Sequence, residues 1–355
     1  MFLTRFSLVL SIVPAIYMLI AGVAWTDHIH RGTELDGIVI FLVVMVLPCL
    51  CAVVRLIEHP RLLYWSDLLV FATTILLMVA TRGGSAWVLA GIPLQGLCAL
   101  FRKAIQMPNG IVLLTGPTGS GKTTTLYTVI NYLKRPGLNI STVEDPIEYN
   151  IRGVNQTQVN LATGMTFARS LRTLLRQDPD IIMVGEMRDQ ETAEIAIRAS
   201  LTGHLVLSTL HTNDAASAVT RMVDMGVEPY LVASSVTMIV AQRLVRRICE
   251  RCKVEDEISD DVRKGIGLGP GTKVYKGLGC SACGRTGYHG RTGVFEVLPV
   301  TEDVRRLINE KAYADAMKDQ AMREGLVTLR DDALAKLVAG VTSLEEVMRE
   351  VCVTA

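Results

Sequence analysis

The spacing of apolar residues divides the chain into two parts. The first part contains long stretches without a charged side chain: Phe6–Trp25 has twenty such residues and Ile38–Val54 has seventeen. A helix needs about twenty predominantly apolar residues to cross the hydrocarbon of a bilayer. We therefore predict two transmembrane helices within residues 1–93. Acidic residues prevail in the loop between them and arginines in the loop after them, which predicts that the N-terminus lies in the cytosol.

Three other interpretations of this apolar part remain open. Phe6–Trp25 has features of a cleaved signal peptide, because Arg5 precedes it and small residues end it. The stretches are also compatible with core helices of a soluble domain. Leu68–Ala80 is short for a span, and as a third span it would require Trp87–Leu100 to return as a fourth. We expect Leu68–Ala80 to be interfacial or buried.

From Leu94 onward, short apolar runs alternate with amphipathic segments. Runs of four to six apolar residues between turn residues are typical of buried strands, and a 3.6-residue period is typical of helices. The alternation over residues 111–225 predicts a parallel sheet with helices on both faces. The predicted strands are 111–115, 139–143, 181–184 and 205–209, and the predicted helices are 122–133, 166–176, 190–200 and 231–248.

The C-terminal part, residues 303–351, has apolar residues at helical spacing, for example Val304/Leu307/Ile308 and Leu334/Leu337/Val338. This pattern predicts a helical packing subdomain.

Charge adds a second contrast between the two parts. The chain has 36 basic and 35 acidic side chains, but residues 1–86 hold only 10 of them. This distribution is typical of a membrane segment followed by a soluble enzyme. The near-neutral total gives no sign of the basic surface that nucleic-acid binding requires.

A glycine-rich segment joins the strand 111–115 to the helix 122–133. Gly116–Thr123 reads GPTGSGKT and fits the phosphate-binding pattern G-x-x-x-x-G-K-[ST]. Backbone N–H groups of such a loop surround an anion at a helix N-terminus. The pattern predicts that Lys122 meets the β- and γ-phosphates of ATP and that the Thr123 hydroxyl binds Mg²⁺. The predicted nucleotide-binding residues are Gly116, Pro117, Thr118, Gly119, Ser120, Gly121, Lys122, Thr123 and Thr124.

Acidic residues follow two of the predicted strands. Glu144 and Glu148 follow the strand 139–143, and Glu186 follows the strand 181–184. Carboxylates at this edge of an α/β sheet bind Mg²⁺ or orient water, although such residues also cap turns. His211 follows the strand 205–209, which predicts a place beside the γ-phosphate or, alternatively, a packing role in a turn.

Four cysteines form two CxxC pairs, Cys249/Cys252 and Cys280/Cys283. This spacing fits a tetrahedral Zn²⁺ site with four thiolates and no open position, which predicts a structural metal. Redox and packing roles are the alternatives. The glycine-rich segment between the pairs has little apolar content, so that metal would be needed to order it.

Taken together, these motifs resemble the boxes of one family, the ATPases of type II secretion and type IV pilus assembly. The similarity begins near Leu94 and covers the rest of the chain. It rests on GPTGSGKTTTLY (116–127), STVEDPIEYNIRGVNQTQVN (141–160), LRQDPDIIMVGEMRD (175–189), TGHLVLSTLHTNDA (202–215), the CxxC pairs and GLVTLRDDALAKLVAGVTSLEEV (325–347).

The resemblance implies roles for individual residues. Glu186 falls in the Walker B box and becomes the candidate catalytic carboxylate, while Glu144 and Glu148 fall in the aspartate box. The histidine box contains His204 and His211. Two basic positions of the family, thought to contact phosphates at subunit interfaces, correspond to Arg172 and Arg176.

The resemblance also implies a RecA-like P-loop core (94–245), a tetracysteine zinc element (246–295) and a helical subdomain (296–355). It implies ATP, Mg²⁺ and Zn²⁺ as cofactors, a homohexamer, platform proteins of a bacterial inner membrane as partners, and an ATPase domain that faces the cytoplasm. In place of the soluble N-terminal region of the family, residues 1–93 contain apolar segments. The rival hypotheses are a nucleotide-binding scaffold that hydrolyses little ATP and a motor for DNA uptake or conjugation.

Overall fold

The computed structural model describes residues 100–352. The predicted membrane segments Phe6–Trp25 and Ile38–Val54, and the apolar stretch Leu68–Ala80, lie outside the described residues. Within 100–352, none of the helices combines the length and the hydropathy that crossing a membrane requires.

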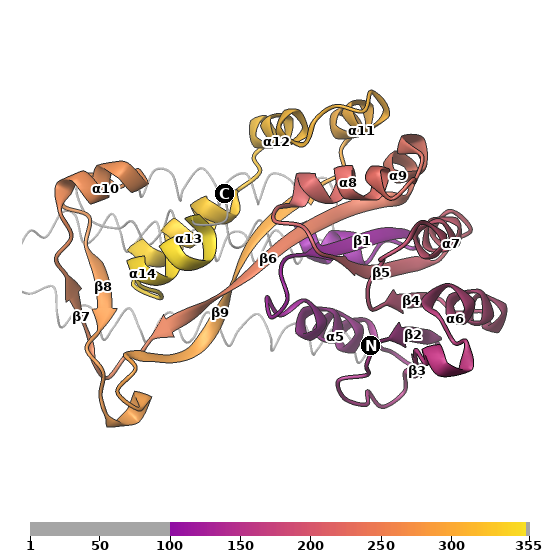
Figure 1. The fold of residues 1–355 in the computed structure, drawn as a ribbon, viewed down its shortest axis with the longest axis horizontal. Helices are drawn as coiled ribbons and strands as arrows, with labels where there is room; N and C mark the ends of the chain where they lie inside the picture. The colour runs from indigo at the N-terminus through magenta and orange to yellow at the C-terminus, as the bar shows by residue number, and fades with distance from the viewer. Residues whose placement is uncertain (1–99, 353–355) are drawn as a thin grey trace, which may run out of the picture. The chain divides into compact units, whose positions relative to one another are not determined.

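A seven-stranded sheet carries the fold, in the order β3-β2-β4-β5-β1-β6-β9 (Figure 1). Six strands are parallel to their neighbours, and only β9 at one edge runs antiparallel to β6. This confirms the predicted parallel sheet and places its four predicted strands within one residue at each end. The strands are β1 (Gly110–Thr115), β2 (Ile140–Glu144), β3 (Asn155–Gln158), β4 (Ile181–Val184), β5 (Leu205–Leu210), β6 (Val236–Ile248) and β9 (Tyr288–Pro299).

Helices cover both faces of the sheet, as predicted. Successive β1 residues point to opposite faces. Val112 and Leu114 pack with the helix α5 (Lys122–Leu133), whereas Ile111 and Leu113 belong to the cluster that contains the other helices of the core. Those helices are α6 (Phe167–Leu174), α7 (Gln190–Leu201), α8 (Ala215–Asp224) and α9 (Pro229–Ser235).

The helix predicted over 231–248 is wrong. The helix α9 ends at Ser235, and Val236–Ile248 forms the thirteen-residue strand β6 between β1 and β9. Both faces of its first half are covered, so apolar residues occupy successive positions there and no two-residue alternation reveals the strand. The β-branched residues Val236, Thr237, Ile239 and Val240 favour the extended conformation.

Beyond β6 the chain forms a small arm and returns along β9. The arm consists of a hairpin-like pair, β7 (Lys253–Asp256) and β8 (Val274–Gly277), with α10 (Asp260–Ile266) between them. The predicted C-terminal helices are confirmed as α11 (Glu302–Asn309), α12 (Ala314–Arg323), α13 (Leu329–Val338), α14 (Leu344–Val347) and a π-helical turn (Met348–Cys352). Val304, Leu337 and Val347 join the same hydrophobic cluster as Ile111, so these helices extend the core of the sheet.

Candidate functional site

The glycine-rich loop Gly116–Thr123 joins β1 to α5, as its pattern predicts. Its backbone requires glycine at Gly116 (φ 147°) and Gly121 (φ 86°). A Cβ atom on Gly116 would lie 2.4 Å from the carbonyl oxygen of Gln242, so the loop packs directly on β6. Lys122 Nζ donates hydrogen bonds to the carbonyl oxygens of Gly116 (2.8 Å) and Pro117 (3.0 Å). Burial lowers the pKa of Lys122, and the charge of Glu186 opposes this shift.

A cavity of about 640 Å³ opens at the carboxyl ends of the strands. The loop contributes Thr118, Gly119, Gly121, Lys122, Thr123 and Thr124 to its wall. The predicted residues Glu144, Glu148, Glu186 and His211 line the same cavity. The structure therefore brings together most of the site residues that the sequence nominated.

Glu186 is nearly buried and belongs to a small charge network. One of its carboxylate oxygens lies 2.5 Å from an Arg188 nitrogen and the other lies 3.4 Å from His211 Nε2. The pKa of His211 falls below its ordinary value, first because of burial and then because of the positive charges of Lys122 and Arg188, while Glu186 opposes the shift. His211 is therefore neutral near pH 7 and keeps one ring nitrogen as a hydrogen-bond acceptor.

The two acidic-box glutamates differ in environment. Glu144 is 2% exposed, and its carboxylate accepts hydrogen bonds from Thr142 Oγ1 (2.6 Å), Gln156 Nε2 (3.1 Å) and the Tyr127 hydroxyl. Glu148 is exposed to the cavity. Burial, followed by the hydrogen bond to Glu144 and its charge, raises the pKa of Tyr127, which keeps the phenol protonated as a donor.

Three predicted residues lie away from this cavity. His204 precedes β5 whereas His211 follows it. The six residues of β5 span about 20 Å, so the two histidines lie at opposite ends of this strand. His204 Nδ1 lies 2.8 Å from the Ala199 carbonyl oxygen, at the end of α7. Arg172 and Arg176 are exposed, and Arg172 forms an ion pair with Glu191 at 2.6 Å.

The structure adds site residues that the sequence interpretation missed. Arg188 and Arg291 line the cavity, and Gln242 holds the loop from β6. Arg188 had a signal, because it stands two residues after Glu186. No local signal marks Gln242 or Arg291, which reach the loop and the cavity, respectively, through pairing of distant strands.

The oxygen atoms that line the cavity are of the kinds that bind the Mg²⁺ ion of a nucleotide. The Thr123 hydroxyl and the carboxylates of Glu148 and Glu186 share one cavity with the cationic Lys122. Mg²⁺ prefers such hard oxygen ligands together with phosphate oxygens and water. The Ser120 hydroxyl, inside the turn of the loop, is buried without a hydrogen-bond partner in the described part of the chain.

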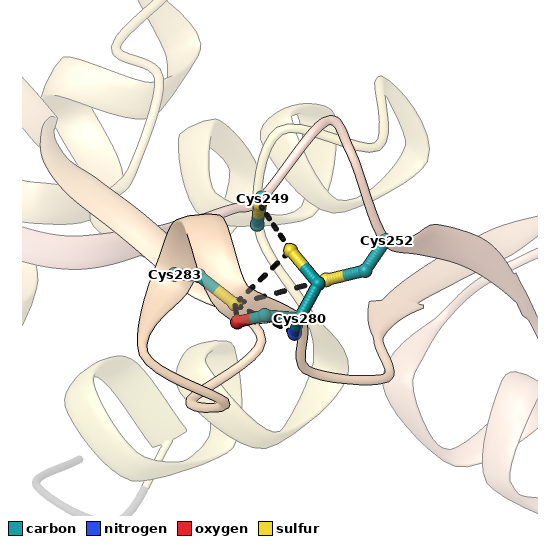
Figure 2. Close-up of side chains that lie close together, drawn as sticks. All are labelled: Cys249, Cys252, Cys280 and Cys283. Carbon is teal, nitrogen blue, oxygen red and sulfur yellow. Dashed lines mark hydrogen bonds between the residues drawn. The ribbon is translucent and has the colours of Figure 1, made fainter.

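The four predicted zinc ligands form a second site at the far end of β6 (Figure 2). Sγ atoms of Cys249 and Cys280 lie 3.9 Å apart, those of Cys252 and Cys283 3.9 Å, and those of Cys280 and Cys283 3.8 Å. A tetrahedron with Zn–S bonds of about 2.3 Å has sulfur–sulfur edges of about 3.8 Å. The cluster thus has the dimensions of a tetrahedral metal site.

Backbone N–H groups support thiolates in this cluster. Cys283 Sγ accepts hydrogen bonds from the backbone N–H groups of Cys280 (3.1 Å) and Gly287 (3.3 Å), and Cys252 Sγ accepts one from Gly279 (3.3 Å). The bond from Cys280 is the main cause that lowers the pKa of Cys283 to about 6. Desolvation and the neighbouring thiols raise that of Cys252 to about 11. A cation is required to hold all four sulfurs as thiolates, because like charges this close repel.

The family profile described as "Type II/IV secretion system protein" matches residues 95–349. The chain belongs to this family. It is 51% identical over 257 residues to the type IV pilus assembly ATPase PilB of Thermus thermophilus, and the aligned region covers 71% of this chain and 29% of PilB. It is 53% identical over 254 residues to the type II secretion system ATPase E of Vibrio cholerae, covering 70% and 50% of the two chains. This secretion-family chain therefore spans half or less of the length of these relatives.

Solved structures agree with the fold of the secretion family. The pilus retraction motor PilT, solved with bound ADP, aligns with a TM-score of 0.53 at 31% identity over 71% of this chain and 63% of PilT. The Legionella pneumophila ATPase DotB aligns with a TM-score of 0.53 at 25% identity, over 72% and 63% of the two chains. The secretion-family chain thus has an α/β P-loop ATPase fold, to which its four-cysteine cluster is joined through β6.

Proposed function

We propose that this chain hydrolyses Mg·ATP in the cavity at the glycine-rich loop. The observation that carries the proposal is that Lys122 and Thr123, at the start of α5, and Glu186, after β4, line one cavity. Because Glu186 already contacts His211 and Arg188, its carboxylate has a fixed orientation before nucleotide binds. A fixed carboxylate beside a phosphate-binding loop is the arrangement that orients a water molecule for attack.

The mechanism assigns a task to each side chain. Backbone N–H groups of the loop and the start of α5 bind the phosphates. Lys122 leaves the carbonyl oxygens of Gly116 and Pro117 and meets the phosphate charge instead. Glu186 orients the attacking water with one oxygen, and neutral His211 holds the other oxygen by donating its Nε2–H to it. Bound Mg²⁺ would neutralise charge on the phosphates, held by the Thr123 hydroxyl and by the cavity carboxylates.

The relatives extend the proposal to a machine. We propose that hydrolysis drives type II secretion or the assembly of a type IV pilus or pseudopilus, because the relatives that are half identical to this chain are named for those systems. The same reasoning supports a homohexamer at the cytoplasmic side of a bacterial inner membrane, with platform proteins of the machine as partners. The exposed Arg172 and Arg176 suit an interface between subunits, where arginines stabilise phosphate charge.

We also propose that Zn²⁺ occupies the four-cysteine cluster as a structural ion, on the sulfur spacing and the N–H···S bonds described above. The predicted division of the chain at residues 94, 246 and 296 stays a proposal about folding units.

The test is ATP turnover by the purified full-length chain in detergent. Lys122→Ala and Glu186→Gln should each abolish turnover, and Glu186→Gln should still bind ATP. The exposed Lys134→Ala and Glu310→Gln are matched controls that should keep wild-type turnover. Wild-type turnover in either site variant would contradict the proposal. Binding without turnover in the wild type would favour the scaffold hypothesis.

A further inference from the structure

Tyr127 connects the helix that follows the phosphate-binding loop to residues 144–149, called the acidic loop below. It lies in α5, five residues after Lys122, and its side chain is fully buried. Its hydroxyl donates to Glu144 and accepts the backbone N–H of Glu148 at 3.3 Å. Its ring packs edge-on against Tyr149, with the ring centroids 4.6 Å apart and an interplanar angle of 82°. One side chain therefore contacts the acidic loop at three residues, Glu144, Glu148 and Tyr149.

The Glu144 carboxylate is engaged within the protein. Two donors, Thr142 Oγ1 and Gln156 Nε2, reach one of its oxygens, and the Tyr127 hydroxyl reaches the other. These donors come from β2, β3 and α5, so that Glu144 ties the edge strand β3 and its neighbour β2 to the helix of the phosphate-binding loop. A buried carboxylate with this many donors is held firmly in place as an acceptor.

Glu148 has the opposite character. Its carboxylate has no hydrogen-bond or ion-pair partner within residues 100–352, and it lines the cavity that also contains Thr123 and Glu186. Its backbone is nevertheless fixed, because its N–H donates to Tyr127. A fixed backbone with an unengaged carboxylate is suited to meet a ligand that arrives with nucleotide.

We propose that Tyr127 is a positioning residue that presents Glu148 to the Mg²⁺ ion of bound nucleotide, with Glu144 as its anchor rather than as a metal ligand. This inference rests on the proposed nucleotide site. Lys122 and Tyr127 lie within two turns of one continuous helix. The positions of the Lys122 ammonium and, through Tyr127, of the Glu148 carboxylate are therefore both set by α5. Without the hydroxyl, the acidic loop loses its hydrogen bonds to that helix and keeps only the ring contact with Tyr149, while the loop Gly116–Thr123 stays intact.

The test compares Tyr127→Phe with Tyr132→Phe in the full-length chain. Tyr132 lies on the same helix, and its exposed hydroxyl accepts a hydrogen bond from Gln106 at a distance from the cavity. Affinity for the non-hydrolysable analogue AMP-PNP is measured by calorimetry in EDTA and across a Mg²⁺ titration. We expect Tyr127→Phe to leave the affinity in EDTA unchanged and to raise the half-saturating Mg²⁺ concentration roughly tenfold, the size of one hydrogen bond linked to a charged group. Tyr132→Phe should match the wild type.

Two further variants separate positioning from a purely structural role. Glu148→Gln should raise the Mg²⁺ requirement as Tyr127→Phe does, and the double variant should add little, because both changes remove the same contact. Equal loss of affinity with and without Mg²⁺ in Tyr127→Phe would overturn the proposal, as would an unchanged Mg²⁺ requirement. If the wild type binds AMP-PNP without hydrolysing ATP, the proposed hydrolysis fails while the Mg²⁺ titration still decides the role of Tyr127. No AMP-PNP binding by the wild type would overturn both.

Discussion

Gln242 braces the phosphate-binding loop from β6, and we expect its replacement by leucine to weaken nucleotide binding. The side chain is 3% exposed. Its Nε2 donates to the Ser120 carbonyl oxygen at 2.8 Å, and its Oε1 accepts from Thr125 Oγ1 at 2.8 Å. These contacts use both ends of the amide, so that leucine of similar volume would remove both without opening a large cavity.

The magnitude follows from the groups left behind. An unpaired buried carbonyl or hydroxyl costs about 1–3 kcal/mol. Ser120 is only 4% exposed, whereas Thr125 is partly exposed and finds water more easily. A loss of about 2 kcal/mol concentrated in the loop corresponds to roughly 30-fold weaker nucleotide binding. Gln242→Glu should weaken binding at least as much, because a carboxylate keeps the acceptor for Thr125 but places negative charge against the Ser120 oxygen.

The assay is calorimetric titration of each variant with Mg·AMP-PNP, alongside its thermal midpoint. Gln106→Leu is the matched control, since Gln106 is exposed and remote from the loop; it should bind as the wild type does. Affinities within twofold of the wild type for both Gln242 variants would refute the idea that β6 organises the loop.

Three other predictions address the second site, pH and the core. The purified chain should contain about one zinc ion per chain, and Cys283→Ser should release it and lower the thermal midpoint by about 5 °C or more, measured by metal analysis and differential scanning fluorimetry. Because the folded pKa of His211 lies below its ordinary 6.5, the stability that this residue contributes should be complete above that pH and decline as pH falls through the lowered pKa. The difference in free energy of unfolding between wild type and His211→Asn should shrink accordingly, and a constant difference from pH 5 to 8 would contradict this. Glu296 is 1% exposed and accepts N–H groups from the first residues of both α8 and α13, so Glu296→Ala should lower the free energy of unfolding by about 2–4 kcal/mol in urea titrations, and a loss under 1 kcal/mol would count against it.

The spacing of apolar residues and the turn residues beside them predict those helices and strands whose ends are marked in the neighbouring sequence. The helix 122–133 and the strand 181–184 match the structure residue for residue, because turn residues bound both segments. The segment 231–248 was misread since a strand covered on both faces and a buried helix share the same apolar run. Its identity depends on pairing with β1 and β9, which are distant in sequence.

The candidate site divides in the same way. Residues at the carboxyl ends of strands, such as Glu186 and His211, were found because the topology brings those ends together. The resemblance of residues 202–215 to the family's histidine box predicts His204 as a further site residue. In the structure, His204 lies at the end of β5 opposite to His211. No sequence pattern predicts the role of Gln242, because that role depends on contacts with residues more than one hundred positions earlier.

The cysteine element is an insertion within a hairpin. Its two ends meet where Ile248 on β6 pairs with Tyr288 on β9, and the backbone N–H of Cys249 reaches the Gly287 carbonyl oxygen at 2.9 Å. A tight turn between these strands could replace the whole element without changing the register of the sheet or any residue of the nucleotide cavity. The element is therefore an insertion between two paired strands, from which Ile266 and Val274 pack into the main hydrophobic core. Replacing residues 249–287 by a two-residue turn is a direct way to separate what the nucleotide cavity does from what the metal-binding arm contributes.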